Sequence, residues 1–214
     1  EAIDAYNEQK SKKVSSEILE TMARATAEIK ATGIEDKSLR VGDRMPDFEL
    51  PNQHGEPRRF SAYLTESPVV LNVYRGGWCP YSNLEMKALH DALPQIQAHG
   101  ARLVGMAPEM PDKAMATAER HQIHIDILSD AGNRVAEGLG LVFELPVSLR
   151  PIYQGLGIDV PAYNGDDSFR LPIPATYIVG RDGVVSYAFV NADYTRRVEP
   201  EEIVKHLSPL AVPA

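Results

Sequence analysis

The chain's one cysteine, Cys79, stands in the segment Arg-Gly-Gly-Trp-Cys-Pro-Tyr-Ser at residues 75–82, after an apolar run and before a helical pattern. Reactive groups in α/β proteins gather at the carboxyl ends of strands, where a strand gives way to a helix. Pro80 suits the first turn of a helix, because its missing N–H is not needed there. We therefore expect Cys79 to begin a helix, where unpaired N–H groups and the positive end of the dipole favour a thiolate.

Three neighbours of Cys79 carry groups that support this chemistry. Arg75, four residues before it, adds positive charge on the same loop. Ser82 falls one helical turn after it, and a serine hydroxyl can donate a hydrogen bond to sulfur. Trp78 can shield one side of the thiol from water. These residues favour a reactive, low-pKa thiolate over the inert buried state that is common for a free cysteine.

The elements that must position this loop alternate between strands and helices. The expected strands cover residues 47–50, 69–74, 102–106, 125–128, 176–179 and 184–190. The expected helices cover residues 86–96, 112–121 and 148–156, with a last helix starting near Pro200. Alternation of this kind predicts βαβ units, and two β runs around a Gly/Asp turn predict an antiparallel hairpin. The sequence thus indicates an α/β fold with a mixed central sheet and helices on both faces.

Two segments lie outside this alternation. Residues 1–32 carry apolar side chains at spacings of three and four, which predicts one extra N-terminal helix that stops at Gly33. Whether its apolar stripe packs on the main domain or on a partner subunit stays open. The proline-rich residues 140–173 predict an irregular insertion. We therefore divide the chain into an N-terminal helical extension, a redox domain and a tail, at residues 1–38, 39–208 and 209–214.

Composition narrows the partners and the compartment. The chain has 214 residues, 43% of them hydrophobic, and a formal net charge of -8, which disfavours nucleic acid and anionic membranes as partners. No run of about 18 apolar residues is present, so no membrane span is expected. A single cysteine cannot form an internal disulfide, which favours a reducing compartment, and we expect the cytoplasm.

Other candidate groups are weaker. His121 and His124 are three residues apart, but zinc needs three or four ligands and no second cluster accompanies them, so we expect no metal and no cofactor. Glu109 follows the strand at 102–106 and would lie at the same sheet edge as Cys79. It could act there as a proton acceptor. The more common state for such a residue is a solvated loop carboxylate.

Motifs around Cys79 resemble a known fold. Residues 78–82 resemble the thioredoxin-type Trp-Cys-x-x-Cys motif, with Ser82 in place of the second cysteine. Residues 173–176, Ile-Pro-Ala-Thr, resemble the segment that carries the cis-proline of that fold. The resemblance implies a thioredoxin-like fold in which Pro174 is cis and packs beside Cys79.

A wider frame resembles the AhpC/TSA-type peroxiredoxins. The similar segments are Val-Gly-Asp-Arg-Met-Pro-Asp-Phe at 41–48, the turn at 52–55 and Tyr-Ile-Val-Gly-Arg-Asp-Gly at 177–183. The resemblance covers residues 39–208. Members of this family carry Pro-x-x-x-Thr/Ser-x-x-Cys, in which the hydroxyl and a distant arginine orient the peroxide. Here Asn72 and Gly76 occupy the first two positions, and Pro174 aligns with the arginine.

The resemblance implies a thiol peroxidase. The Cys79 thiolate would reduce hydrogen peroxide or an organic hydroperoxide, become a sulfenic acid, and be recycled by an external thiol such as thioredoxin or glutathione. The absent threonine and arginine keep a thioredoxin-type thiol–disulfide oxidoreductase open as an alternative. A third hypothesis is a non-enzymatic redox sensor or binding module. A homodimer is one candidate assembly.

Overall fold

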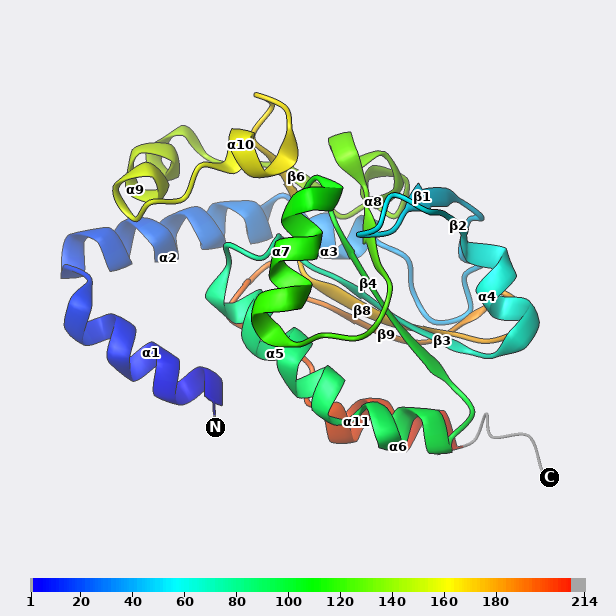
Figure 1. The fold of residues 1–214 in the computed structure, drawn as a ribbon. Coiled ribbons are helices and arrows are strands. Elements are labelled where there is room, and N and C mark those ends of the chain that lie inside the picture. Colours follow the sequence, from blue (N-terminus) through cyan, green and yellow to red (C-terminus); the bar gives the residue numbers. More distant parts are fainter. Residues whose placement is uncertain (1, 209–214) are drawn as a thin grey trace.

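The central layer of the protein is a five-stranded mixed sheet, seen in a computed structural model that describes residues 2–208 (Figure 1). The strand order is β5-β4-β3-β8-β9. The strands are β3 (Val69–Val73), β4 (Arg102–Ala107), β5 (Ile127–Ser129), β8 (Ala175–Val179) and β9 (Val185–Val190). β3, β4 and β5 run parallel, whereas β8 and β9 run antiparallel to their neighbours. The mixed sheet predicted from the sequence is confirmed.

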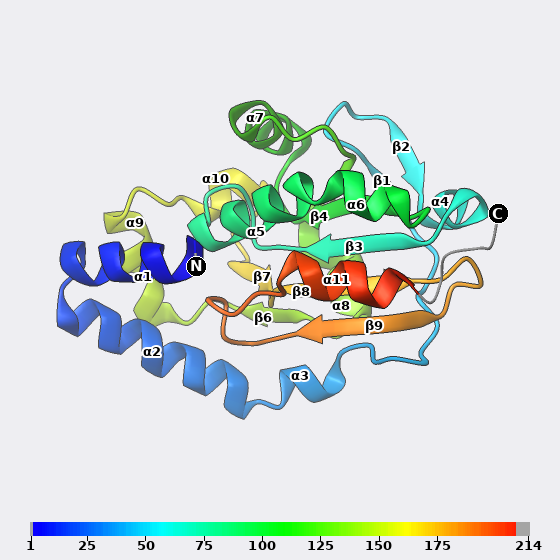
Figure 2. The ribbon, with the colours of Figure 1, turned by 90° about the horizontal axis from the view of Figure 1, so that it is seen from below.

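Helices cover both faces of this sheet (Figure 2). The helices are α1 (Ala2–Lys13), α2 (Ser16–Ala31), α3 (Ile34–Lys37), α4 (Phe60–Glu66), α5 (Pro80–Asp91), α6 (Leu93–Ala98), α7 (Pro111–His121), α8 (Arg134–Gly138), α9 (Arg150–Gly155), α10 (Val160–Asn164) and α11 (Pro200–Leu207). Successive residues of β3 point to opposite faces, so Val70 packs with α5, α6 and α11 while Leu71 packs on the side of α3 and α4. Both faces of β3 are therefore buried, as its β-branched sequence predicts.

Two small antiparallel sheets complete the strands. One pairs β1 (Glu49–Pro51) with β2 (Pro57–Arg59), and the other pairs β6 (Val142–Glu144) with β7 (Arg170–Pro172). The second lies inside the predicted insertion at 140–173. α9 confirms the short helix predicted there, and the insertion is more regular than expected because it also holds this sheet and α10. The division of the chain at residues 38 and 208 stays a prediction, and the predicted tail at 209–214 lies outside the described residues.

The predicted single helix over residues 1–32 is wrong: α1 and α2 are separate. Ser15 leaves the helical region (φ −61°, ψ 151°) and its hydroxyl accepts a hydrogen bond from the Ile18 amide, so it caps a new helix. The apolar stripe continues on α2 only, where Met22 and Ala25 are buried against the insertion, including Tyr153. The stripe thus packs on the same chain. The helical pattern at 86–96 is likewise divided at Ala92, which ends α5 and begins α6.

Candidate functional site

Cys79 is the N-cap residue of α5, directly after the loop that leaves β3. Its backbone is extended (φ −89°, ψ 114°), Pro80 is the first helical residue, and the Asn83 amide donates the first helical hydrogen bond to the Cys79 carbonyl. The side chain is only 2% exposed. The predicted position of Cys79 at a strand-to-helix junction is confirmed.

The Gly76-Gly77 pair lets this loop approach α7 closely. Gly76 has a φ of +132°, a conformation that side chains with a Cβ rarely adopt. A Cβ on Gly77 would lie 1.9 Å from the Thr117 hydroxyl of α7, so only glycine fits there. Asn83 donates a hydrogen bond to the Gly77 carbonyl at 2.8 Å, which ties the loop to the helix that it begins.

Glu109 forms hydrogen bonds to the same loop. It is fully buried, and its two carboxylate oxygens accept hydrogen bonds from the Gly77 amide at 2.9 Å and from the Tyr74 hydroxyl at 3.1 Å. Burial raises the pKa of Glu109, and these two hydrogen bonds oppose the rise. The interpretation as a solvated loop carboxylate is wrong. Glu109 does lie at the sheet edge that carries Cys79, but its oxygens face Gly77 and Tyr74, so it positions the loop.

Arg75 is a buried cation inside an aromatic cage. Its side chain is 2% exposed, and its guanidinium donates a 2.6 Å hydrogen bond to the Tyr153 hydroxyl. The guanidinium carbon lies 4.6 Å from the ring centre of Tyr194 and 5.0 Å from that of Trp78. Within residues 2–208, Arg75 forms no ion pair with a carboxylate. A buried charge needs a compensating partner, which leaves a Cys79 thiolate as the natural counter-ion.

Arg197 is a second buried arginine that sequence reasoning missed. It comes from the segment after β9 and forms a 2.6 Å ion pair with Glu85 of α5. Its other terminal nitrogen lies 3.4 Å from the Ser82 hydroxyl, so Ser82 stands between Arg197 and the cysteine. Because Glu85 neutralises much of its charge, Arg197 has less effect on Cys79 than Arg75 has.

These groups decide the ionisation of Cys79. Burial raises the pKa of the thiol, because it disfavours the charged form. The positive charges of Arg75 and Arg197, together with hydrogen bonding from Ser82, outweigh burial, so the pKa of Cys79 lies below its ordinary value. The structure thus brings Arg75, Ser82 and Cys79 together as the sequence predicts, and adds Arg197 from a distant segment.

Trp78 and Pro174 both lie against Arg75. The Trp78 ring packs on Tyr153, with ring centres 5.7 Å apart, and covers one side of Arg75. Pro174 lines a small apolar cavity together with Arg75 and Tyr194. The predicted cis peptide at Pro174 is wrong, since no cis peptide bond occurs in residues 2–208. The trans form is the lower-energy isomer. The Pro174 carbonyl accepts a hydrogen bond from the Asn191 amide just before β8.

Arg197, Tyr153 and Tyr194 carry no motif that would have distinguished them in the sequence. Tyr153 lies in the proline-rich insertion, and Arg197 lies in a charged turn after a hairpin. The one available signal is that Tyr194 and Arg197 lie close together in the sequence, in the segment between β9 and α11.

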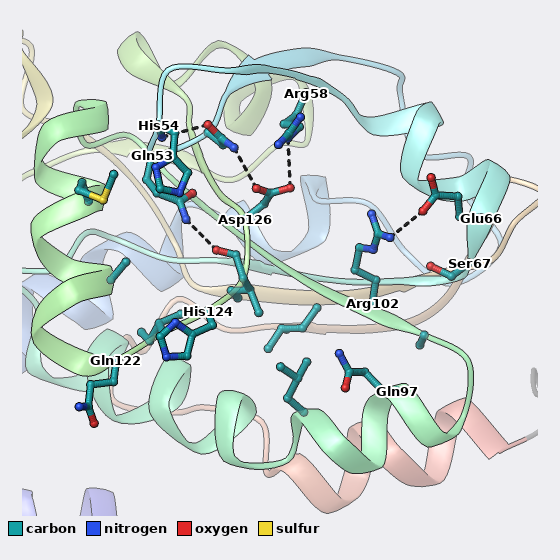
Figure 3. Close-up of a pocket in the computed structure, with 18 of the residues that line it drawn as sticks. Gln53, His54, Arg58, Glu66, Ser67, Gln97, Arg102, Gln122, His124 and Asp126 are labelled. Atoms are coloured by element: carbon teal, nitrogen blue, oxygen red, sulfur yellow. Dashed lines mark hydrogen bonds and ion pairs between the residues drawn. The ribbon is translucent and has the colours of Figure 1, made fainter.

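A wide groove lies at the opposite end of the sheet (Figure 3). It has a volume of about 1050 Å³ and borders the starts of β4 and β5, whereas Cys79 follows the end of β3. Four of its charged side chains pair with one another, Arg102 with Glu66 and Arg58 with Asp126. These pairs leave little charge for a ligand.

Two further features were searched in the described part of the chain. Across residues 2–208, no group of three or more His, Cys, Asp or Glu side chains is arranged to hold a metal ion. None of the helices between Ala2 and Ser208 combines the length and apolar character that crossing a membrane requires.

The fold and the buried cysteine at its strand-to-helix junction define a redox protein of the thioredoxin-like class. Comparison with known proteins gives the family. The AhpC/TSA family matches residues 41–188, which is more than half of the chain, and the chain belongs to this family.

Relatives agree with this assignment. Over 114 residues the chain is 33% identical to Rv1608c of Mycobacterium tuberculosis strain H37Rv, classed among the peroxiredoxins; the match covers 53% of this chain and 74% of that one. It is 26% identical over 103 residues to peroxiredoxin Bcp of Escherichia coli K12, covering 48% of this chain and 65% of Bcp. The crystal structure of peroxidoxin BcpB from Mycobacterium tuberculosis has a TM-score of 0.64 and 24% identity, covering 80% of this chain and 98% of that one. This last likeness shows the shared fold.

Proposed function

We propose that the protein is a thiol peroxidase that uses Cys79 to reduce hydrogen peroxide or organic hydroperoxides. The observation that carries the proposal is the buried Cys79 thiol facing Arg75, a buried cation with no carboxylate partner in the described chain. A thiolate is the form that attacks a peroxide, and this site favours the thiolate. The relatives named peroxiredoxins support the same activity.

The proposed reaction has two stages. The Cys79 sulfur attacks the nearer peroxide oxygen, the O–O bond breaks, and the departing oxygen takes a proton to leave as water or an alcohol. Sulfur is thereby oxidised to a sulfenic acid. An external thiol then attacks that sulfur and releases water, and a second thiol breaks the mixed disulfide and restores Cys79. Thioredoxin and glutathione are the proposed thiol donors, because Ser82 provides no second sulfur.

Arg75 and Arg197 are the proposed substitutes for the family's orienting groups. Asn72 lies inside β3 with its amide bonded to Thr176, and Gly76 has no side chain, so neither contacts a peroxide at the sulfur. Two guanidinium groups beside the sulfur supply donors for the peroxide oxygens and stabilise the charge that develops on the leaving oxygen.

Stopped-flow fluorescence of Trp78, the only tryptophan of the chain, tests the proposal directly. The reduced protein is mixed in turn with hydrogen peroxide, cumene hydroperoxide and glutathione disulfide. A fluorescence change that is fastest with a peroxide, and absent in Cys79→Ser, is expected. A faster reaction with glutathione disulfide would establish the thiol–disulfide oxidoreductase instead. Stoichiometric oxidation without turnover by any added thiol would favour the sensor.

The setting of this activity is also proposed. A single cysteine is typical of a reducing compartment, and we propose the cytoplasm. A homodimer is the proposed assembly to test by sedimentation, with mass doubling as the expected result.

A further inference from the structure

A buried ion pair lies behind the Cys79 site. Glu85, on the helix that Cys79 begins, accepts a 2.6 Å hydrogen bond from Arg197, which comes from the segment between β9 and α11 (Figure 2). The two side chains are 2% and 1% exposed. A buried pair of this kind adds little stability over apolar residues of similar volume, because both charges lose their water. Its place beside the site therefore points to a role in the chemistry of the sulfur.

Arg197 connects the pair to the groups around the sulfur. Its second terminal nitrogen lies 3.4 Å from the Ser82 hydroxyl, and Ser82 forms a hydrogen bond with Cys79. Its Nε donates a 3.0 Å hydrogen bond to the Tyr194 carbonyl, and the Tyr194 ring packs on the Arg75 guanidinium at 4.6 Å. The position of Arg197 thus affects both Ser82 and the cage of Arg75.

Glu85 is held in turn from the centre of the sheet. Its other carboxylate oxygen accepts a 3.4 Å hydrogen bond from the Thr176 hydroxyl of β8, and Thr176 accepts a 3.0 Å bond from the Asn72 amide of β3. All three side chains are buried. The Asn72 carbonyl oxygen has no partner among residues 2–208. A half-satisfied asparagine costs stability in a buried strand, and the bond that it does form supports Thr176 and, through Thr176, Glu85.

The charge of Glu85 opposes the charge of the arginines. Arg75 has no carboxylate partner among the described residues, whereas Arg197 has Glu85. Glu85 therefore leaves about one full positive charge beside the sulfur instead of two. The difference matters because a more strongly stabilised thiolate is a weaker nucleophile, and its rate constant falls with its pKa with a Brønsted coefficient of about 0.4–0.5.

Other titratable groups also interact with the thiolate. They are Lys10 and Tyr6 of α1, Tyr81 of α5, Tyr153 of α9, and Tyr194. Burial raises the pKa of each of these tyrosines, so they are uncharged near neutral pH. Lys10 adds positive charge, and Asp193 acts on Lys10 and Tyr194. All of these groups are retained when only Glu85 is changed.

We propose that Glu85 is a positioning residue that sets the nucleophilicity of the Cys79 thiolate. Its carboxylate holds Arg197 against Ser82 and offsets the Arg197 charge, while Thr176 and Asn72 keep the carboxylate in place. For the peroxide reaction this role rests on the proposed thiol peroxidase function. Nucleophilicity also governs the reaction of a thiolate with other electrophiles, which makes the role measurable without a peroxide.

The test uses the full chain with Glu85→Gln, which keeps the shape and an acceptor oxygen for Arg197 and removes the negative charge. Glu66→Gln is the matched control, because Glu66 forms a 2.6 Å ion pair with Arg102 in which both side chains are exposed. The pKa of Cys79 is measured by thiolate absorbance. Rate constants are then measured at a pH above that pKa, with iodoacetamide and with hydrogen peroxide, which are both uncharged.

The pKa of Cys79 should fall in Glu85→Gln, because the Arg197 charge is no longer offset. A neighbouring charge changes a pKa by roughly 1–3 units, and we expect about 1 unit here, since Glu85 acts through Arg197. The rate constant of the fully formed thiolate should then fall about threefold with both reagents, given the Brønsted coefficient of about 0.4–0.5. The pKa and the rate constants should not change in Glu66→Gln. Loss of packing alone would instead move Arg197 away from Ser82 and raise the pKa.

A second variant applies if Glu85→Gln does not fold, since that change leaves Arg197 buried without a carboxylate. Glu85→Met/Arg197→Met replaces the whole pair by apolar side chains, a change that is often neutral for stability. Because the two charges largely cancel, the pKa of Cys79 should stay within about half a unit of the value in the parent chain. A rise of about one unit or more would show that Arg197 acts with its full charge, and would overturn the proposal.

The outcomes separate the role of Glu85 from the proposed function. A pKa that is unchanged or higher in Glu85→Gln, or an equal change in Glu66→Gln, overturns the role of Glu85. A lower pKa with an unchanged rate constant for iodoacetamide also overturns it, because the thiolate would then be equally nucleophilic. A lower pKa with slower alkylation, and no oxidation of any of the proteins by peroxide, supports the role of Glu85 and overturns the peroxidase function.

Discussion

Replacing Arg75 by methionine should raise the pKa of Cys79 and slow peroxide reduction at neutral pH. Methionine fills a similar volume in the aromatic cage and removes the charge, together with the hydrogen bond to Tyr153. A single opposite charge at about 4–6 Å changes a pKa by roughly 1–3 units. Arg75 is at the large end of this range, because it is buried and no carboxylate in the described chain neutralises it. Each unit changes the ratio of thiolate to thiol tenfold, so the rate measured at a pH below both pKa values should fall between about tenfold and about 1000-fold.

The assay is thiolate absorbance followed through a pH titration, with the peroxide rate constant measured at each pH. The rate of Arg75→Met should recover only in part as the pH rises above the new pKa, because the thiolate is then restored but the proposed guanidinium donor to the peroxide is not. A rate that recovers fully when the thiolate is formed would show that Arg75 acts through ionisation alone. Arg75→Lys should fall between the two, because it keeps the charge and loses the planar fork. Arg196→Met is the control, since Arg196 is 75% exposed on the neighbouring segment; an equal change in this control, or an unchanged midpoint in Arg75→Met, would refute the reasoning.

Three further outcomes follow from the same contacts. The pKa of Cys79 is lower in the folded than in the unfolded protein, so between those two pKa values the unfolded chain holds more protons. The stability of the reduced protein relative to Cys79→Ser should therefore rise with pH across that window, and this gain should be lost as the pH falls through the folded pKa. Urea unfolding at several pH values measures this difference, and a difference that does not change with pH would contradict the prediction. Ser82→Cys places a thiol one turn from Cys79, so after one equivalent of peroxide the intact mass of this variant should fall by two hydrogens. The parent chain should instead gain one or two oxygens. A variant that also gains oxygen would show that the two side chains do not meet. Glu109→Leu should destabilise the protein by about 1–3 kcal/mol and slow the reaction of Cys79 with peroxide, because the Gly77 amide and the Tyr74 hydroxyl lose their buried acceptor. Glu109→Gln should retain most of the stability and most of the rate. Equal effects in the two variants, measured by urea unfolding and peroxide kinetics, would argue against this positioning role.

The strand-to-helix junction was predictable because its signals are local. The β-branched run at Val69–Val73, the glycine pair and Pro80 each constrain their own stretch of backbone, and together they leave one conformation for the loop. The same locality explains the success with β4 and α7, whose observed bounds differ by one residue from the predicted ones. These elements follow from periodicity and from residues that begin a helix.

The rest of the site was not predictable, because its parts meet only through tertiary packing. Arg197 approaches Ser82 from the end of the chain, and Tyr153 approaches Arg75 from the insertion. Neither contact leaves a spacing that a single sequence displays. The division of the N-terminal region is a different failure. Ser15 followed by Glu17 was a usable helix-start signal, and the apolar spacing across it concealed the break.

The absence of the family's threonine three residues before the cysteine is a consequence of loop geometry. Gly76 occupies that position with a φ of +132°, and a Cβ there would lie 2.7 Å from the Trp78 indole nitrogen. A β-branched residue is therefore excluded while the loop keeps this path. The path itself places the next residue, Gly77, against α7 and directs Arg75 into the aromatic cage. The loop thus has no hydroxyl at position 76 and carries a buried guanidinium at position 75, whose charge lowers the pKa of Cys79.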